Sequence, residues 1–225
     1  MARLSKPRKS VFREYTEAIL IALIAALFLR AFVVQAFKIP SGSMIPTLVI
    51  GDHILVNKLS YGVRLPDLNW VPFAGCVDLA RGSHVVNWDA PERGDVVVFI
   101  YPQDRCKDFI KRVVGVPGDE VVIRDKKVFI NGEPVEDSHA HFEDQGMTLG
   151  AGHLRDNLGP VKVPEGHVFV MGDNRDRSFD SRFWGFVPIN DVRGRAFVKY
   201  WSWDSEREQG SWQRLRWWRI GGLIY

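Results

Sequence analysis

The residues with the clearest chemical potential are a serine and a lysine that lie far apart in the chain. Ser43 stands in PSGSMIPTL (40–48), a loop rich in glycine and proline, and Lys111 stands in FIKRVVGVPGD (109–119). A serine hydroxyl is a weak nucleophile and needs a base. A lysine amine can be that base once burial has lowered its pKa from about 10.4. The pair therefore predicts nucleophilic catalysis with Ser43 as nucleophile and Lys111 as base.

The residues around Lys111 favour burial of its amine. If the segment is a strand, side chains alternate between faces, so Lys111 shares its face with Phe109 and Val113 while Arg112 points the other way. The alternative is a surface lysine beside an arginine in an edge strand.

A histidine base is the competing arrangement for a serine nucleophile. The chain lacks the Gly-x-Ser-x-Gly elbow of many hydrolases. None of its histidines stands in a segment that suggests a catalytic role: His53, His84, His139, His141, His153 and His167. We therefore prefer the lysine.

Further polar residues could complete such a site. Ser41 lies two residues before Ser43, so its hydroxyl could stabilise the same oxyanion as the Ser43 N–H. The segment 172–188 is dense in acids and arginines and contains Ser178, which could bond the lysine amine. The alternative for this segment is a salt-bridged surface loop. We expect four charged residues to form a polar frame around the serine and lysine: Asp173, Asp180, Arg112 and Arg182.

The N-terminal part of the chain predicts a membrane anchor. Residues 1–14 are basic, residues 19–29 are wholly apolar, and a further apolar stretch follows Arg30. A span needs about 20 residues, which 15–37 supplies if Arg30 snorkels to the interface. The basic tail at 1–14 should stay in the cytoplasm, so residues 38–225 should lie outside it. The alternative is a signal peptide cut after Val34-Gln35-Ala36. We favour the uncleaved anchor.

The remainder is predicted to be one mainly β domain. Short segments rich in Val and Ile are bounded by Gly and Pro, which is typical of an antiparallel β-sandwich or barrel-like fold. We expect strands at 53–59, 95–101, 120–123, 127–130, 167–171 and 195–201. Residues 64–93 and about 131–165 are expected to be long loops or a small inserted β subdomain. The net charge of +3 gives no reason to expect nucleic acid as a partner.

The cysteines and the C-terminal tail leave alternatives open. Cys76 and Cys106 form no Cys-x-x-Cys pair, which argues against a thiolate zinc site, and they are either bridged to each other or unpaired. Residues 201–225 hold five of the eight tryptophans, interleaved with arginines. This tail suits the lipid headgroup layer, or it packs its tryptophans on the core.

Four blocks, in order, resemble bacterial type I signal peptidases (leader peptidases), membrane serine proteases with a Ser–Lys dyad. The blocks are PSGSMIPTL (40–48), GDHILVNK (51–58), KRVVGVPGD (111–119) and GDNRDRSFDSRFWG (172–185). In the last block, positions 177 and 179 match no fixed residue of the family pattern. Many relatives carry two membrane helices before the serine, whereas this chain has one.

The resemblance implies a role for each matched residue. Ser43 would be the nucleophile, Lys111 the general base, Ser41 part of the oxyanion hole and Ser178 the residue that orients the lysine amine. Asp173 with Arg112, and Asp180 with Arg182, would be structural ion pairs. Shallow pockets for small side chains would be lined by Phe37, Ile39, Met44, Leu48, Phe109 and Ile110.

The resemblance also implies a function. The chain would cut signal peptides from exported preproteins after Ala-x-Ala, without a metal or other cofactor, on the outer face of the bacterial cytoplasmic membrane. A narrower alternative is a Ser–Lys peptidase dedicated to one pilus or conjugation subunit, and a third is a non-enzymatic β module that binds envelope proteins. The chain's own Val34-Gln35-Ala36 is expected to resist cleavage because the anchor leads directly into the catalytic loop.

Overall fold

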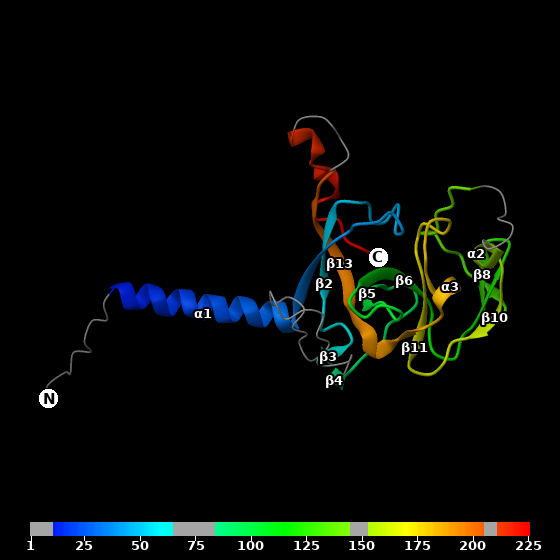
Figure 1. Cartoon of the computed structure of the whole chain (residues 1–225), viewed down its shortest axis with the longest axis horizontal. Coiled ribbons are helices and arrows are strands. Elements are labelled where there is room, and N and C mark those ends of the chain that lie inside the picture. Colours follow the sequence, from blue (N-terminus) through cyan, green and yellow to red (C-terminus); the bar gives the residue numbers. More distant parts are fainter. Residues whose placement is uncertain (1–10, 65–83, 145–152, 205–210) are drawn as a thin grey trace.

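A long helix projects from one side of a mainly β domain in the computed structural model, which describes residues 11–64, 84–144, 153–204 and 211–225. The N-terminal end of the helix lies farthest from the domain (Figure 1). The helices are α1 Val11–Phe32, α2 His153–Asp156 and α3 Ser181–Trp184, with 3-10 turns η2 Ile189–Asp191, η3 Ser211–Arg214 and η4 Trp217–Arg219. The strands are β1 Val34–Lys38, β2 Asp52–Asn57, β3 Gly62–Arg64, β4 His84–Asn87, β5 Val96–Ile100, β6 Asp108–Gly115, β7 Glu120–Arg124, β8 Lys127–Ile130, β9 Glu133–Pro134, β10 Leu158–Lys162, β11 His167–Met171, β12 Val187–Pro188 and β13 Val192–Ser202.

The helix α1 buries none of its residues against the domain. Within the described ranges it is the one helix that is long and apolar enough to cross a membrane. A helix that is apolar on all sides is either enclosed by protein or surrounded by lipid. Since no protein encloses α1, its composition fits the predicted anchor.

The expected span to Phe37 is too long. The helix ends at Phe32, and Val34–Lys38 forms β1, which pairs antiparallel with β2 from Val34↔Asn57 to Lys38↔His53. The backbone groups of this segment find partners in β2, which a continued helix would forgo. The Lys58 amine also donates to the Ala31 carbonyl over 2.7 Å, so the last turn of α1 is tied to the domain.

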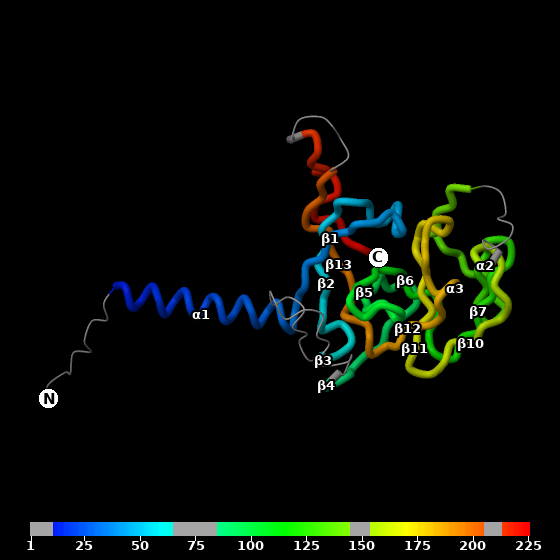
Figure 2. The backbone as a smooth tube through the Cα atoms, viewed as in Figure 1, coloured from blue at the N-terminus to red at the C-terminus, as the bar shows by residue number. Residues whose placement is uncertain are grey.

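One curled antiparallel sheet carries the main part of the domain, as the sequence predicted. Its seven strands run in the order β1-β2-β13-β5-β6-β11-β12. Figure 2 shows β2 and β13 on one side, β5 and β6 in the middle, and β11 and β12 on the other side. Each of the six segments expected to be strands contributes a strand here or to the small sheet described next, with ends shifted by a few residues.

A second, four-stranded sheet forms the small β unit, with the order β10-β7-β8-β9. It lies on the side of the domain away from α1 (Figure 1). The unit begins at Glu120, earlier than the insert expected from about residue 131, because β7 and β8 supply its central strands. Its side chains share one hydrophobic cluster with the main sheet, in which Val121, Ile123, Val128 and Ile130 pack with Val114, Phe169 and Met171.

The region expected to be a long loop at 64–93 contains a two-stranded ribbon of β3 and β4, and residues 65–83 lie outside the described ranges. Cys106 is disulfide-bonded. Cys76 is the other cysteine of the sequence and lies in the undescribed stretch. The unpaired-thiol alternative is therefore wrong for Cys106.

In the C-terminal tail, two arginines contact the domain and two tryptophans are exposed to solvent. Arg219 donates to the buried Asp52 carboxylate over 2.6 Å, and Arg216 donates to the Ile50 carbonyl over 2.8 Å. Trp217 and Trp218 are exposed. These two arginines therefore hold the loop between β1 and β2 from behind, while these two tryptophans face outward.

Candidate active site

The fold brings Ser43 and Lys111 into direct contact. Ser43 lies in the loop between β1 and β2, and Lys111 lies in β6. The distance from Lys111 Nζ to Ser43 Oγ is 2.7 Å, and the amine also donates to the Ile110 carbonyl over 3.0 Å. Both side chains are buried, with residues 7% and 4% exposed.

Burial explains why the Lys111 amine can act as a base. Desolvation lowers the pKa of Lys111 to about 8, and Arg182 adds to this, whereas Asp180 and Asp173 oppose it. Phe109 covers one side of the amine, 5.6 Å from its ring centroid. The edge-strand alternative is wrong, because β6 lies between β5 and β11 within the sheet.

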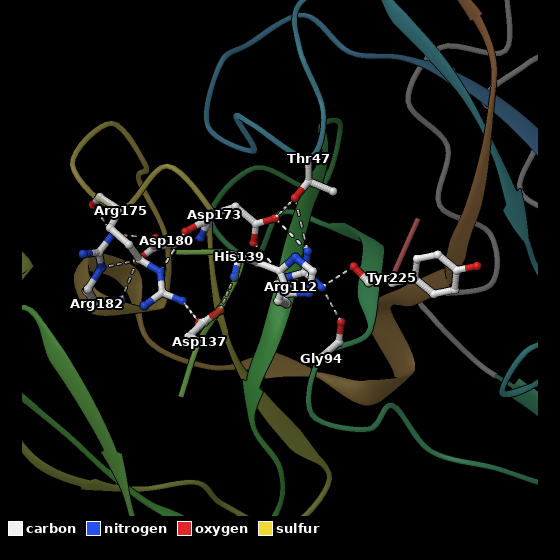
Figure 3. Close-up of polar contacts among 11 residues, drawn as sticks. Thr47, Gly94, Arg112, Asp137, His139, Asp173, Arg175, Asp180, Arg182 and Tyr225 are labelled. Carbon is white, nitrogen blue, oxygen red and sulfur yellow. Dashed lines mark hydrogen bonds and ion pairs between the residues drawn. The ribbon is translucent and has the colours of Figure 1, made fainter. Parts of the chain in front are cut away.

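Arg112, the neighbour of Lys111, is also buried and forms one half of the polar frame. Its guanidinium makes two bonds to Asp173, of 2.8 and 2.7 Å, and donates to the carbonyls of Gly94 and Tyr225 over 2.7 Å each (Figure 3). Asp173 also accepts a bond from the Thr47 hydroxyl. The pair therefore connects β6 to the loop that carries Ser43.

Asp180 and Arg182 form the other half of the frame, again through two bonds, of 2.8 and 2.9 Å. Asp180 accepts from the Gly172 N–H over 3.1 Å, and Arg182 donates to the Arg175 carbonyl over 2.7 Å. Burial alone would raise the pKa of the Asp180 carboxyl, but Arg182 holds it below its usual value. The segment that was expected to frame the site is thus internally cross-linked and buried, and the surface-loop alternative is wrong for these residues.

Ser178 lies beside the dyad but makes a different contact from the one expected. Among the described residues, its buried hydroxyl has no hydrogen-bond partner within bonding distance. It still lies near enough to Asp180 to help lower the pKa of that carboxyl. It packs against Gly172, where it and the Ser43 carbonyl occupy the space that a Cβ would fill. That carbonyl accepts the Asn174 N–H over 3.1 Å.

A cleft of about 330 Å³ opens in front of the dyad. Ser41 lies at its exposed edge, on the same loop as Ser43. The residues that line the cleft include no histidine: Pro40, Ser41, Ser43, Asp108, Phe109, Ile110, Lys111, Arg177 and Phe179.

The six residues expected to line substrate pockets divide into two groups. Phe37, Ile39, Phe109 and Ile110 line a second cavity of about 30 Å³ next to the cleft, which leaves room for only a small side chain. Met44 and Leu48 are fully buried in the hydrophobic cluster beneath the Ser43 loop. They support this loop from below and do not line either of these two cavities.

Several residues of the site escaped the sequence analysis. Thr47 and Asn174 hold the Ser43 loop, and both lie inside matched blocks, which was the available signal. Arg177 and Phe179 line the cleft, but they occupy two of the three open positions of the last block, the third being Phe183. Arg219 gave no signal, because its contact with Asp52 joins residues from opposite ends of the domain.

Comparison with known proteins identifies the family of this chain. A family model described as "Signal peptidase, peptidase S26" matches residues 12–201. The chain is 42% identical to signal peptidase I of Pseudomonas fluorescens and 39% identical to that of Pseudomonas aeruginosa, in each case over 84% of this chain and 72% of the relative. It is 37% identical to a probable signal peptidase I-2 of Synechocystis, over 87% of this chain and 76% of the relative.

A crystal structure of a signal peptidase I from Enterococcus faecalis is also similar, with 33% sequence identity. It covers 47% of this chain and 95% of its own, with a TM-score of 0.38, so the superposition does not bear on the fold.

The curled β domain and its serine site define a serine endopeptidase. The chain belongs to the signal peptidase family, peptidase S26.

Proposed function

We propose that this chain is a membrane-anchored signal peptidase that works with Ser43 as nucleophile and Lys111 as general base. The observation that carries the proposal is the 2.7 Å contact between a buried amine, whose pKa is lowered to about 8, and the serine hydroxyl. A general base must lie within hydrogen-bond reach of the proton it removes and have a pKa near the working pH. Lys111 meets both conditions.

The reaction would proceed by two acyl transfers. Lys111 takes the proton of Ser43 as Oγ attacks the scissile carbonyl, and it returns the proton to the leaving amine. The acyl group then forms an ester with Ser43, and water activated by Lys111 hydrolyses it. The Ser43 N–H and the Ser41 hydroxyl are positioned on one loop to stabilise the oxyanion.

The frame residues would support this reaction by holding the segments around Ser43 and Lys111 in place. The Arg112–Asp173 pair holds the Ser43 loop through Thr47, and the Asp180–Arg182 pair holds the segment around Gly172. Ser178, which lies at Gly172 next to the Ser43 carbonyl, would orient the amine during the reaction.

The small cavity supports a preference for small side chains. An extended substrate peptide would lie beside β6 and the end of β1, bound through its backbone. A side chain as small as alanine fits the cavity lined by Ile39 and Ile110. We therefore propose exported preproteins that end their signal peptide in Ala-x-Ala as the substrates.

The anchor determines where this reaction takes place. We propose that α1 crosses the bacterial cytoplasmic membrane once, with the basic residues 1–14 in the cytoplasm and residues 38–225 outside it. The chemistry needs no cofactor, because the base and the oxyanion donors are supplied by the chain.

The test is cleavage of an Ala-x-Ala preprotein by the full-length protein in detergent, beside Ser43→Ala and Lys111→Ala. Each substitution should lower kcat by about 10³-fold or more, because nucleophile and base act as one unit. Lys127→Ala, an exposed lysine in β8, is the matched control and should retain full activity. Undiminished cleavage by Lys111→Ala would refute the base, and cleavage of a single pilus or conjugation subunit alone would favour the narrower peptidase.

A further inference from the structure

Two residues of the cleft, Arg177 and Phe179, have no part in the dyad or its frame. Both line the cavity in front of Ser43 and Lys111. They stand on either side of Ser178 in the block 172–185. The cleft therefore has a wall that combines a cation and an aromatic ring.

Phe179 forms the apolar part of this wall. Its ring is 52% exposed. It stacks on Phe183 with 5.4 Å between centroids and meets the edge of Tyr101 at 6.5 Å, and Tyr101 in turn stacks on Phe109 at 4.3 Å. These contacts hold the ring in place over the cleft although half of it faces solvent.

Arg177 forms the charged part of the wall. Its side chain is 73% exposed and pairs with Glu143, which also accepts a bond from the Asn174 amide over 2.8 Å. A guanidinium carries five N–H donors, so this single partner leaves others for a ligand. The acid that lines the cleft, Asp108, is paired with Arg193 over 2.6 Å.

The wall and the small cavity share Asp108, Phe109 and Ile110 of β6 but differ in their other residues. Phe37 and Ile39 line the small cavity, whereas Arg177 and Phe179 line the cleft. Successive side chains of an extended peptide point to opposite sides. If the two alanines of Ala-x-Ala face Ile39, the residue between them faces Phe179 and Arg177.

We propose that Arg177 and Phe179 form a subsite for the middle residue of Ala-x-Ala and that this subsite favours an acidic side chain, glutamate above all. The carboxylate would pair with the exposed guanidinium, and the side-chain methylenes would lie on the Phe179 ring. The cleft of about 330 Å³ is large enough for such a side chain. This proposal rests on the proposed function and specifies its substrate further.

The experiment uses the full-length protein in detergent and peptides that differ only in the middle residue, which is glutamate, glutamine or lysine. The wild type should cut them with kcat/KM falling in that order, with about a fivefold ratio of glutamate to lysine at low salt, as expected of an exposed ion pair. The ratio should fall toward one as salt is added.

Three variants make the test specific. Arg177→Glu should invert the ratio, and Glu143→Gln should increase it, because the guanidinium loses its competing carboxylate while glutamine can still accept the Asn174 bond. Arg124→Glu, the same charge change on an exposed arginine of β7, is the matched control and should keep the wild-type ratio.

The outcomes separate the subsite from the peptidase itself. Equal cleavage of the three peptides by the wild type, or an unchanged ratio in Arg177→Glu, would overturn the subsite while the peptidase stands. A preference that appears only when the residue after the scissile bond is varied would overturn it as well. Cleavage of none of the peptides would sink the proposed function and the subsite together.

Discussion

At the scale of single residues, the site depends on a lysine whose charged form is disfavoured by burial. Burial disfavours the charged amine, and no carboxylate is bonded to it: Lys111 donates only to the Ser43 hydroxyl and the Ile110 carbonyl. Asp173 and Asp180 are engaged by their own arginines. The two carboxylates near the amine are thus paired with arginines and not with the amine itself. Desolvation therefore dominates, and the pKa of Lys111 falls to about 8.

This pKa makes a prediction about pH. Below about 8 the folded protein holds Lys111 mainly protonated, and a protonated lysine cannot accept the serine proton. The value of kcat/KM should therefore rise about tenfold per pH unit up to pH 7, bend near pH 8 and level above it. The measurement is peptide cleavage from pH 5.5 to 9.5, with circular dichroism at each pH to confirm folding. A flat profile, or a rise that continues to pH 9.5 without a bend, would contradict a buried Lys111 with a pKa near 8 as the base.

At the scale of elements, the connection between β11 and α3 positions Ser43. It begins at Gly172, where the Ser178 hydroxyl and the Ser43 carbonyl occupy the space that a Cβ would fill. Asp173 and Asn174 follow, and each bonds the loop that carries Ser43. The catalytic loop is therefore held by a segment more than a hundred residues away in sequence.

Because Gly172 has no side chain, the Ser43 carbonyl can approach it closely. We therefore predict that Gly172→Ala is harmful. A Cβ there would collide with the Ser43 carbonyl, a backbone atom that cannot turn aside. We expect a loss of about 2–3 kcal/mol in the free energy of unfolding and about 100-fold in kcat/KM. Denaturant unfolding and peptide cleavage measure the two effects.

Gly159→Ala in β10 is the control, because a Cβ at that position meets nothing within 4 Å. It should be nearly neutral in both measurements. Equal effects of the two substitutions would show that the close contact at Gly172 is unimportant.

At the scale of the whole molecule, the junction between α1 and the domain lies at Val33. Before it, α1 contacts little of the domain, and after it β1 is the first strand of the main sheet. Cutting after Ala36 would therefore remove three paired residues of β1 along with the helix. This speaks for the uncleaved anchor over the cleavable signal peptide.

Two truncated proteins test this junction. A chain that begins at Val33 should fold and cut soluble peptides, because it keeps all of β1. A chain that begins at Phe37 loses the pairing of Val34 to Ala36 and should be about 2 kcal/mol less stable, with a Tm about 4–8 °C lower. Equal Tm values for the two chains would place the domain boundary at Phe37, as first expected from the sequence.

Local patterns were sufficient for much of this protein. The apolar run of α1 and the short Val- and Ile-rich strands follow from spacing and composition alone, because they depend on neighbours within a few residues. The resemblance of the matched blocks also predicted roles for Ser43, Lys111 and the four frame residues before any contact was known. Short-range pattern therefore determined the fold class, and the resemblance supplied the candidate chemical groups.

Only the tertiary structure decided how these groups meet. The Ser43–Lys111 contact, the end of α1 at Phe32 and the full burial of Met44 and Leu48 all depend on pairing or packing with distant segments. The same holds for Arg177 and Phe179, whose place in the cleft depends on Glu143 and Tyr101. Such contacts arise when strands far apart in sequence share one sheet, and a local pattern carries no information about which strand will be the neighbour.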